Sequence, residues 1–110
     1  MATSEEIAGI FPQMAENFVP EKAEGVDATI QFELSGDNGG NFWLRIADGK
    51  CEAGEGTADN PKMTLRAAAD DWYAVSTGET NPMQAFMSGK IKIQGDMGLA
   101  MKLQTMFNQP

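Results

Sequence analysis

Period-two alternation of apolar and polar residues is the feature that most restricts the fold of this chain. In residues 26–34, VDATIQFEL, the apolar residues alternate with four residues expected to face water, Asp27, Thr29, Gln31 and Glu33. The same alternation recurs in three later segments, residues 42–47, 62–67 and 90–95. Asp48-Gly49 suits a tight hairpin into a further strand, residues 50–54. Because such strands have one apolar face, we expect a sheet that is covered on one side only.

Four segments have the spacing or the end signals of helices. The first covers residues 4–18, where Ser4 can cap the helix and Pro12 predicts either a later start or a kink. The other three are residues 67–78, 82–88 and 97–107. Asn81 and Asp96 would cap the last two of these helices. The order α-β-β-β-β-α-α-β-α predicts an α+β domain with a largely antiparallel sheet and helices on one face.

The length and the charge of the chain restrict its partners. A chain of 110 residues is expected to form a single domain, residues 1–110. Its formal net charge of −8 would repel a phosphate backbone, so we expect no nucleic-acid partner. The apolar runs fall short of the roughly 20 residues that a membrane span needs, so we expect no stable membrane insertion. The N-terminal residues lack the basic and apolar regions of a signal peptide, and we therefore expect a cytoplasmic protein.

The side chains that could carry chemistry give no positive case for an enzyme. The chain has no histidine, which removes the commonest general base and the commonest transition-metal ligand. The single cysteine, Cys51, is expected in or beside a strand as a small apolar residue. Asp70 and Asp71 stand where a helix begins, and so do Glu5 and Glu6. Capping and dipole effects explain both pairs, so we expect no catalytic residue, no cofactor and no metal ion.

Methionine is unusually frequent toward the end of the chain. We expect five methionines on the inward surface of the helices there, Met83, Met87, Met97, Met101 and Met106. Composition alone favours a solid core over a cavity, although methionine is unbranched and recurs at apolar sites that accept ligands of different shapes. The charged residues on the outer face of the strands are expected to pair across an exposed surface: Asp27, Glu33, Arg45, Lys62, Arg66, Lys90 and Lys92.

Residues 78–104, GETNPMQAFMSGKIKIQGDMGLAMKLQ, closely resemble the C-terminal signature of the sterol carrier protein type 2 family of lipid-binding domains. Residues 61–72 resemble the family's fourth strand and the helix start after it, residues 42–50 its second strand and hairpin, and residues 25–34 its first strand. The likeness covers roughly residues 20–107. It implies a five-stranded sheet covered on one side by helices, with an apolar tunnel between them that takes fatty acids, fatty acyl-CoAs, phospholipids and sterols.

This resemblance changes the expectation from a solid core to a hollow one. It implies non-enzymatic binding and intracellular transfer or sequestration of a lipid or fatty acyl ligand. The residues expected to bind the ligand come from the first helix, the sheet and the later helices: Met14, Phe18, Ile30, Phe32, Phe42, Leu44, Met83, Phe86, Met87, Leu99, Met101 and Leu103. The ligand would reach the tunnel by movement of the last helix or of the residues after it.

Two other functions stay open. The chain could be an accessory or protein-interaction domain that keeps the fold with a filled core, no lipid cargo and an unidentified protein partner. The small residues Ala85 and Ala100 instead favour space between the helices. The chain could also be a weak hydrolase or isomerase acting on acyl-CoA, which would need Asp70, Asp71 or Cys51 in a catalytic role.

Overall fold

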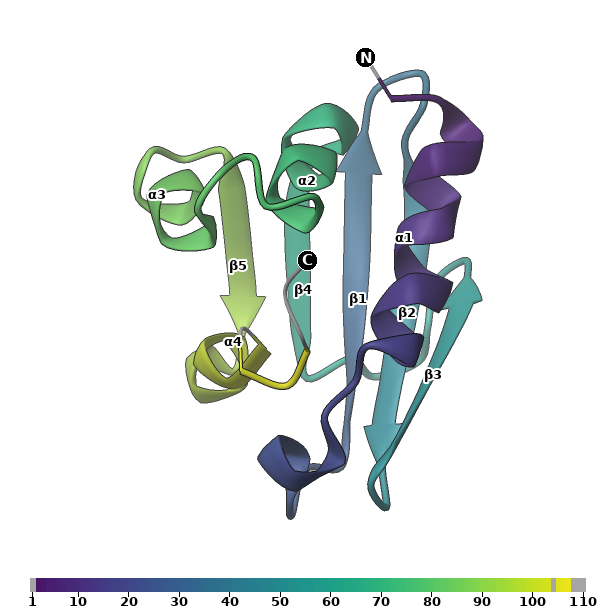
Figure 1. Cartoon of the computed structure of the whole chain (residues 1–110), viewed down its shortest axis with the longest axis vertical. Coiled ribbons are helices and arrows are strands. Elements are labelled where there is room, and N and C mark those ends of the chain that lie inside the picture. The colour runs from purple at the N-terminus through teal and green to yellow at the C-terminus, as the bar shows by residue number, and fades with distance from the viewer. Residues whose placement is uncertain (1, 104, 108–110) are drawn as a thin grey trace.

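Five strands form one mixed sheet in the computed structural model of the chain, which describes residues 2–103 and 105–107 (Figure 1). The strands are β1 (Ala28–Ser35), β2 (Gly40–Ala47), β3 (Lys50–Glu55), β4 (Met63–Ala68) and β5 (Ile91–Gly95). Their order across the sheet is β3-β2-β1-β4-β5. β1 and β4 are parallel, and the other three neighbouring pairs are antiparallel. The predicted α+β class with a mostly antiparallel five-stranded sheet is confirmed.

The helices pack on the apolar face of this sheet. They are α1 (Ser4–Glu16), α2 (Ala69–Ser76), α3 (Pro82–Met87) and α4 (Met97–Leu103), and a short 3-10 helix, η1 (Pro20–Ala23), lies between α1 and β1 in the chain. α1 contacts β2 and β3, α2 contacts β4, and α3 and α4 contact β5. Figure 1 shows where each helix lies relative to these strands. Among the described residues, none of the helices combines the length and the apolar character needed to cross a membrane.

The first helix differs from its prediction at both ends. Its N-cap is Thr3 rather than Ser4, because the Thr3 hydroxyl accepts the Glu6 N–H at 3.1 Å while Glu6 Oε1 accepts the Thr3 N–H at 3.0 Å. This reciprocal capping box satisfies two backbone donors of the first turn. The helix starts at Ser4 and continues through the exposed Pro12, so the prediction of a later start is wrong. It ends at Glu16, earlier than predicted.

The later helices are shorter than predicted, although their caps are correct. α2 begins only at Ala69, because β4 stays paired with β1 through the preceding residue. α4 ends at Leu103. The predicted caps are confirmed, since the side chains of Asn81 and Asp96 accept backbone N–H groups of α3 and α4 at 2.8 and 3.0 Å.

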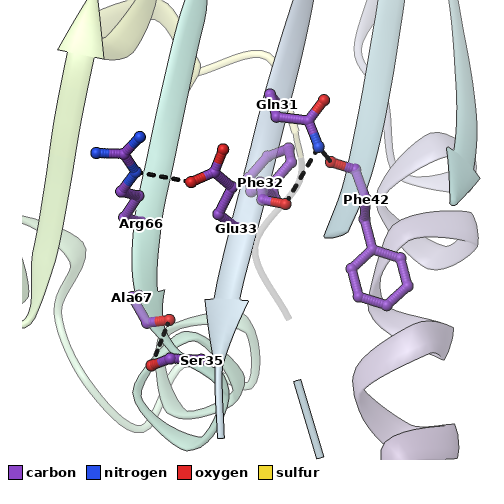
Figure 2. A network of polar contacts seen from close by, with 7 residues as sticks. All are labelled: Gln31, Phe32, Glu33, Ser35, Phe42, Arg66 and Ala67. Atoms are coloured by element: carbon purple, nitrogen blue, oxygen red, sulfur yellow. Dashed lines mark hydrogen bonds and ion pairs between the residues drawn. The ribbon is translucent and has the colours of Figure 1, made fainter. Parts of the chain in front are cut away.

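Gln31 is buried, although its place in the alternation predicted a wet position. Only 2% of the residue is exposed. Its Nε2 donates to the Phe42 and Gly56 carbonyl oxygens, both at 3.0 Å, and its Oε1 accepts the Ala58 N–H at 2.8 Å. The bond to Phe42, on the neighbouring strand, is visible in Figure 2. The loop after β3 therefore folds over this point of the outer face and is fastened to it by one amide side chain.

The remainder of the outer face carries ion pairs. Arg66 Nε lies 2.7 Å from Glu33 Oε1, across the parallel β1–β4 pair (Figure 2), and Arg45 pairs with Asp27. The predicted pairing of charged residues across this face is confirmed for these four residues. All four side chains are at least two-fifths exposed, so each pair contributes little to stability.

The part of the core beneath α1 is filled by aromatic rings. Phe11 of α1 stacks on Phe42 with ring centroids 4.5 Å apart, and its centroid lies 5.0 Å from that of Phe32. Ile30 and Leu44, opposite one another in the β1–β2 register, have no exposed surface. This half of the molecule is a solid core.

Candidate functional site

A cavity of about 730 Å³ lies on the other half of the helix-covered face. Its floor comes from β4 and β5, and its walls come from α1, α2, α3, α4 and Phe107. The volume is within the range of about 300–1,000 Å³ that is usual for small-molecule sites. The apolar side chains of the lining are Ile10, Met14, Leu65, Trp72, Val75, Met83, Phe86, Ile91, Ile93, Met97, Ala100, Met101, Leu103 and Phe107.

Short helices leave this space open. α3 and α4 each have fewer residues than α1, and each presents an alanine at its buried face, Ala85 and Ala100. Ala100 lines the cavity directly. The phenylalanines that line it, Phe86 and Phe107, lie in its walls, and Phe86 is partly turned to the surface. The space between the helices and β4–β5 therefore remains unfilled.

Four large apolar side chains line the cavity and also reach the surface. We call Met83, Phe86, Met97 and Met101 the methionine rim; all four come from α3 and α4. Their exposed fractions run from 38% for Phe86 to 72% for Met101. The methionines of the rim line the cavity as predicted but are also exposed, whereas the prediction that Met87 faces inward is wrong, because it is 79% exposed and lies outside the lining. Clustered exposed apolar side chains are a mark of binding surfaces.

The structure brings some of the predicted ligand-binding residues together and separates others. Five of them line the cavity: Met14, Met83, Phe86, Met101 and Leu103. Four belong to the solid core beneath α1: Ile30, Phe32, Phe42 and Leu44. Leu99 is buried, Met87 is on the surface, and Phe18 packs on Phe107 with centroids 5.6 Å apart, beside the cavity. Which residues bind a ligand stays a prediction.

Sequence reasoning overlooked the contribution of α2. Trp72 and Val75 line the cavity and are buried, and Tyr73 and Ser76 line it beside them. The available signal was the spacing of Trp72, Val75 and Ser76, which lie three and four residues apart on one helical face. The indole N–H of Trp72 is buried without a hydrogen-bond partner among the described residues. Such a donor is costly to leave unmet, so it favours a ligand oxygen nearby.

The wall formed by α1 and α2 carries the polar side chains of the lining beside its apolar ones. They are Glu6 and Gln13 from α1, Asn17 just after it, and Tyr73 and Ser76 from α2. The Tyr73 hydroxyl donates to Glu6 Oε2 at 3.1 Å. The hydrogen bonds from the Thr3 backbone and from Tyr73 hold the pKa of Glu6 below its ordinary value. Glu6 is therefore an anion at neutral pH.

The residues considered for catalysis lie elsewhere. Asp70 Oδ1 accepts hydrogen bonds from the Ala2 N–H at 3.1 Å and from the Asn38 amide at 3.0 Å, so it fastens the start of the chain to the β1–β2 turn. Cys51 lies within β3, as predicted, and burial with the nearby Glu52 raises the pKa of its thiol to about 11. Neither residue, nor Asp71, is among the residues that line the cavity.

Comparison with known proteins identifies this arrangement. The model of the SCP-2 sterol transfer family matches residues 10–108. The chain belongs to this family. The resemblance found in residues 78–104 is thereby confirmed.

Individual members of the family give the scale of the likeness. Hydroxysteroid dehydrogenase-like protein 2 of Xenopus tropicalis is 38% identical over 96 residues, which are 86% of this chain and 23% of that protein. This chain thus spans about a quarter or less of the curated relatives it matches. The solution structure of sterol carrier protein domain 2 of Helicoverpa armigera is 33% identical, with a TM-score of 0.71, over 89% of this chain and 80% of that one.

A lipid-loaded structure has the same fold. Palmitated SCP2L2 from Aedes aegypti superposes with a TM-score of 0.77 over 98% of this chain and 97% of that chain. At 20% sequence identity this likeness concerns the fold alone.

Proposed function

We propose that this SCP-2 domain binds one lipid in the cavity and transfers or sequesters it without catalysing a reaction on it. The observation that carries the proposal is a mainly apolar cavity of about 730 Å³ in a chain of the SCP-2 sterol transfer family. Fatty acids, fatty acyl-CoAs, sterol-like molecules and phospholipids are the candidate ligands. The palmitate carried by the Aedes aegypti relative supports an acyl chain as one occupant of this fold.

Burial of methylene groups is sufficient for useful affinity. Each buried methylene contributes about 0.8 kcal/mol, so a ten-carbon stretch contributes roughly 8 kcal/mol before the costs of association and ordering. Without those costs this free energy would correspond to a dissociation constant of about 1 μM, so micromolar binding needs a buried chain longer than ten carbons. The lining then needs few specific polar contacts.

The methionine rim is the proposed route for the ligand. A chain that passes between α3 and α4 meets apolar side chains both at the surface and inside, because the rim residues occupy both. Methionine side chains adapt to a passing ligand because they are unbranched. α4 is short and is followed closely by residues that pair with the segment after α1, where the Val19 N–H donates to the Met106 carbonyl at 2.6 Å. Displacement of α4 would widen the cavity.

Intrinsic fluorescence tests binding directly, since Trp72 lines the cavity and Trp43 lies on β2, with its ring against Gly54 on the outer face. In a Trp43→Phe variant the remaining tryptophan reports the cavity. Titration with a long-chain lipid below its aggregation concentration is expected to change the emission saturably, with a midpoint near the micromolar range. An unchanged spectrum, together with no lipid extracted from gently purified protein, would contradict the proposal.

Filling the cavity with a large side chain is a second test of binding, and the same substitution on the surface is its matched control. Ala100→Phe places a ring in the lining, whereas Met87→Phe places the same ring on the adjacent exposed surface. The first variant is expected to weaken lipid binding at least about tenfold, and the second to leave it within about twofold. Equal affinities in both variants would show that the ligand binds elsewhere.

The competing functions receive less support. A filled core without cargo agrees poorly with the cavity, but an accessory role beside an enzyme is favoured by the greater length of the dehydrogenase-like relatives. That role becomes the leading proposal if no lipid binds. Catalysis on acyl-CoA would require Asp70, Asp71 or Cys51, which lie outside the lining.

A further inference from the structure

The charge of the cavity lining distinguishes among the candidate lipids. Among the described residues that line the cavity, Glu6 is the only charged one, and none is lysine or arginine. The five positions outside the description contain neither lysine nor arginine. An ionised carboxylate or phosphate inside this lining would therefore meet one negative charge and no described cation.

The Glu6 carboxylate keeps capacity for a further hydrogen bond. Its Oε1 accepts the Thr3 N–H at 3.0 Å, and its Oε2 accepts the Tyr73 hydroxyl at 3.1 Å. A carboxylate offers about four acceptor positions, so these two bonds leave room for a third donor. Glu6 is exposed, which places this acceptor where the cavity meets solvent between α1 and α2.

The neighbours of Glu6 are polar but uncharged. Gln13 of α1 and its C-cap Asn17 continue the same wall, and Ser76 of α2 and its C-cap Thr77 stand on α2's side of it. The opposite wall consists of the methionine rim. The cavity thus has an apolar side on α3 and α4, whereas its side on α1 and α2 combines apolar residues with hydrogen-bonding groups and carries the negative charge of Glu6.

We propose that the cavity prefers an uncharged lipid that ends in a hydroxyl group, with this hydroxyl donating to Glu6, over an ionised fatty acid or acyl-CoA. The proposal rests on the proposed function and specifies the ligand class. The ligand hydroxyl can also accept a hydrogen bond from an amide or hydroxyl of the same wall. A carboxylate at this position would instead be repelled by Glu6.

The test compares two ligands with the same chain length, 1-dodecanol and dodecanoate, at pH 8 by Trp72 fluorescence. The alcohol leaves water more readily in any case, so the informative quantity is the change produced by Glu6→Gln. Glutamine can occupy the same capping-box position and can still accept from Tyr73, so the variant keeps the helix start intact. We expect Glu6→Gln to raise the affinity for dodecanoate about threefold and to change that for dodecanol by less than about 1.5-fold, because Glu6 is exposed and its charge is screened by solvent.

Two further variants control the interpretation. Glu5→Gln removes the same charge one residue away from an exposed position outside the lining, and is expected to leave both affinities unchanged. Gln13→Lys adds a cation to the polar wall without touching the helix cap, and is expected to favour dodecanoate in the same way as Glu6→Gln. If Glu6→Gln were too unstable to measure, Gln13→Lys would decide the matter alone.

The possible outcomes distinguish failure of the proposed lipid binding from failure of the inferred role of Glu6. Failure of both ligands to bind any of these proteins would overturn the proposed function and this inference with it. Binding of both ligands with no gain for dodecanoate in Glu6→Gln or in Gln13→Lys would overturn the inference while lipid binding stands. An equal gain in Glu5→Gln would attribute the effect to net charge, and would likewise overturn a role for Glu6 at the ligand.

Discussion

Replacing Gln31 by leucine should destabilise the protein more than any other exchange of a glutamine on the outer face of the sheet. The Gln31 amide makes three bonds of 2.8–3.0 Å, to Phe42, Gly56 and Ala58, and is 2% exposed. Each such bond contributes about 0.5–1.5 kcal/mol net, which bounds the loss at roughly 1.5–4.5 kcal/mol. Gly56 is exposed and Ala58 half-buried, so their freed groups can turn to water. We therefore expect a loss of about 2–3 kcal/mol in the free energy of unfolding.

Gln94→Leu is the matched control. Gln94 lies in the same row of the outer face, since Gln31 pairs with Thr64 and Thr64 with Gln94, but it is exposed. Its replacement should change the free energy of unfolding by no more than about 0.5 kcal/mol. Urea denaturation followed by circular dichroism measures the free energy of unfolding of both variants. In thermal unfolding, a drop of roughly 10–20 °C in Tm is expected for Gln31→Leu. Equal losses in the two variants would refute the fastening role of Gln31.

Three further predictions concern stability, reactivity and motion. Gly54→Ala should lower the free energy of unfolding in urea by about 1–3 kcal/mol, because the new Cβ would lie 2.2 Å from the Trp43 ring. Gly9→Ala should raise it by about 0.5–1 kcal/mol, because Gly9 is in a helix and has open space around it. A change of the same sign in both variants would contradict this reasoning. Cys51 should react slowly with thiol reagents at pH 7.5 and faster toward pH 11. The stability that its buried thiol contributes should fall as the pH rises from 9 to 11, because the thiol of the unfolded chain ionises first. A reaction rate at pH 7.5 equal to that of a free thiol would refute the raised pKa. Hydrogen exchange should be faster in α4 than in β1, and equal protection with rapid ligand exchange would exclude α4 as the moving element.

The elements of the fold were predictable because each carries a local signal. Period-two alternation marked the strands, and the side chains of Asn81 and Asp96 marked the starts of α3 and α4. Gln31 escaped prediction because its burial depends on a loop after β3, which is far along the chain and has no periodic pattern. Alternation states that a side chain faces one side of a sheet, and it does not state what covers that side.

The same limit applies to the lining of the cavity. Leu44 and Leu65 have the same character in the sequence and point to the same face of the sheet, yet Leu44 belongs to the solid core and Leu65 to the cavity floor. The difference comes from the helix above each residue. Exposure of the rim residues was equally hidden, because Met97 and Met101 are spaced as a buried helical stripe would be.

Division of one sheet face into a solid half and a hollow half has a physical consequence. The aromatic cluster of Phe11, Phe32 and Phe42 buries large side chains under α1, where loss of a ring would remove several kcal/mol of stability. The helices over β4 and β5 are short and expose large apolar side chains, so they contribute less to the core. Stability is therefore concentrated where no ligand is proposed to bind. The hollow half can then remain open and adaptable without unfolding the domain, as the proposed reversible binding of a lipid would require.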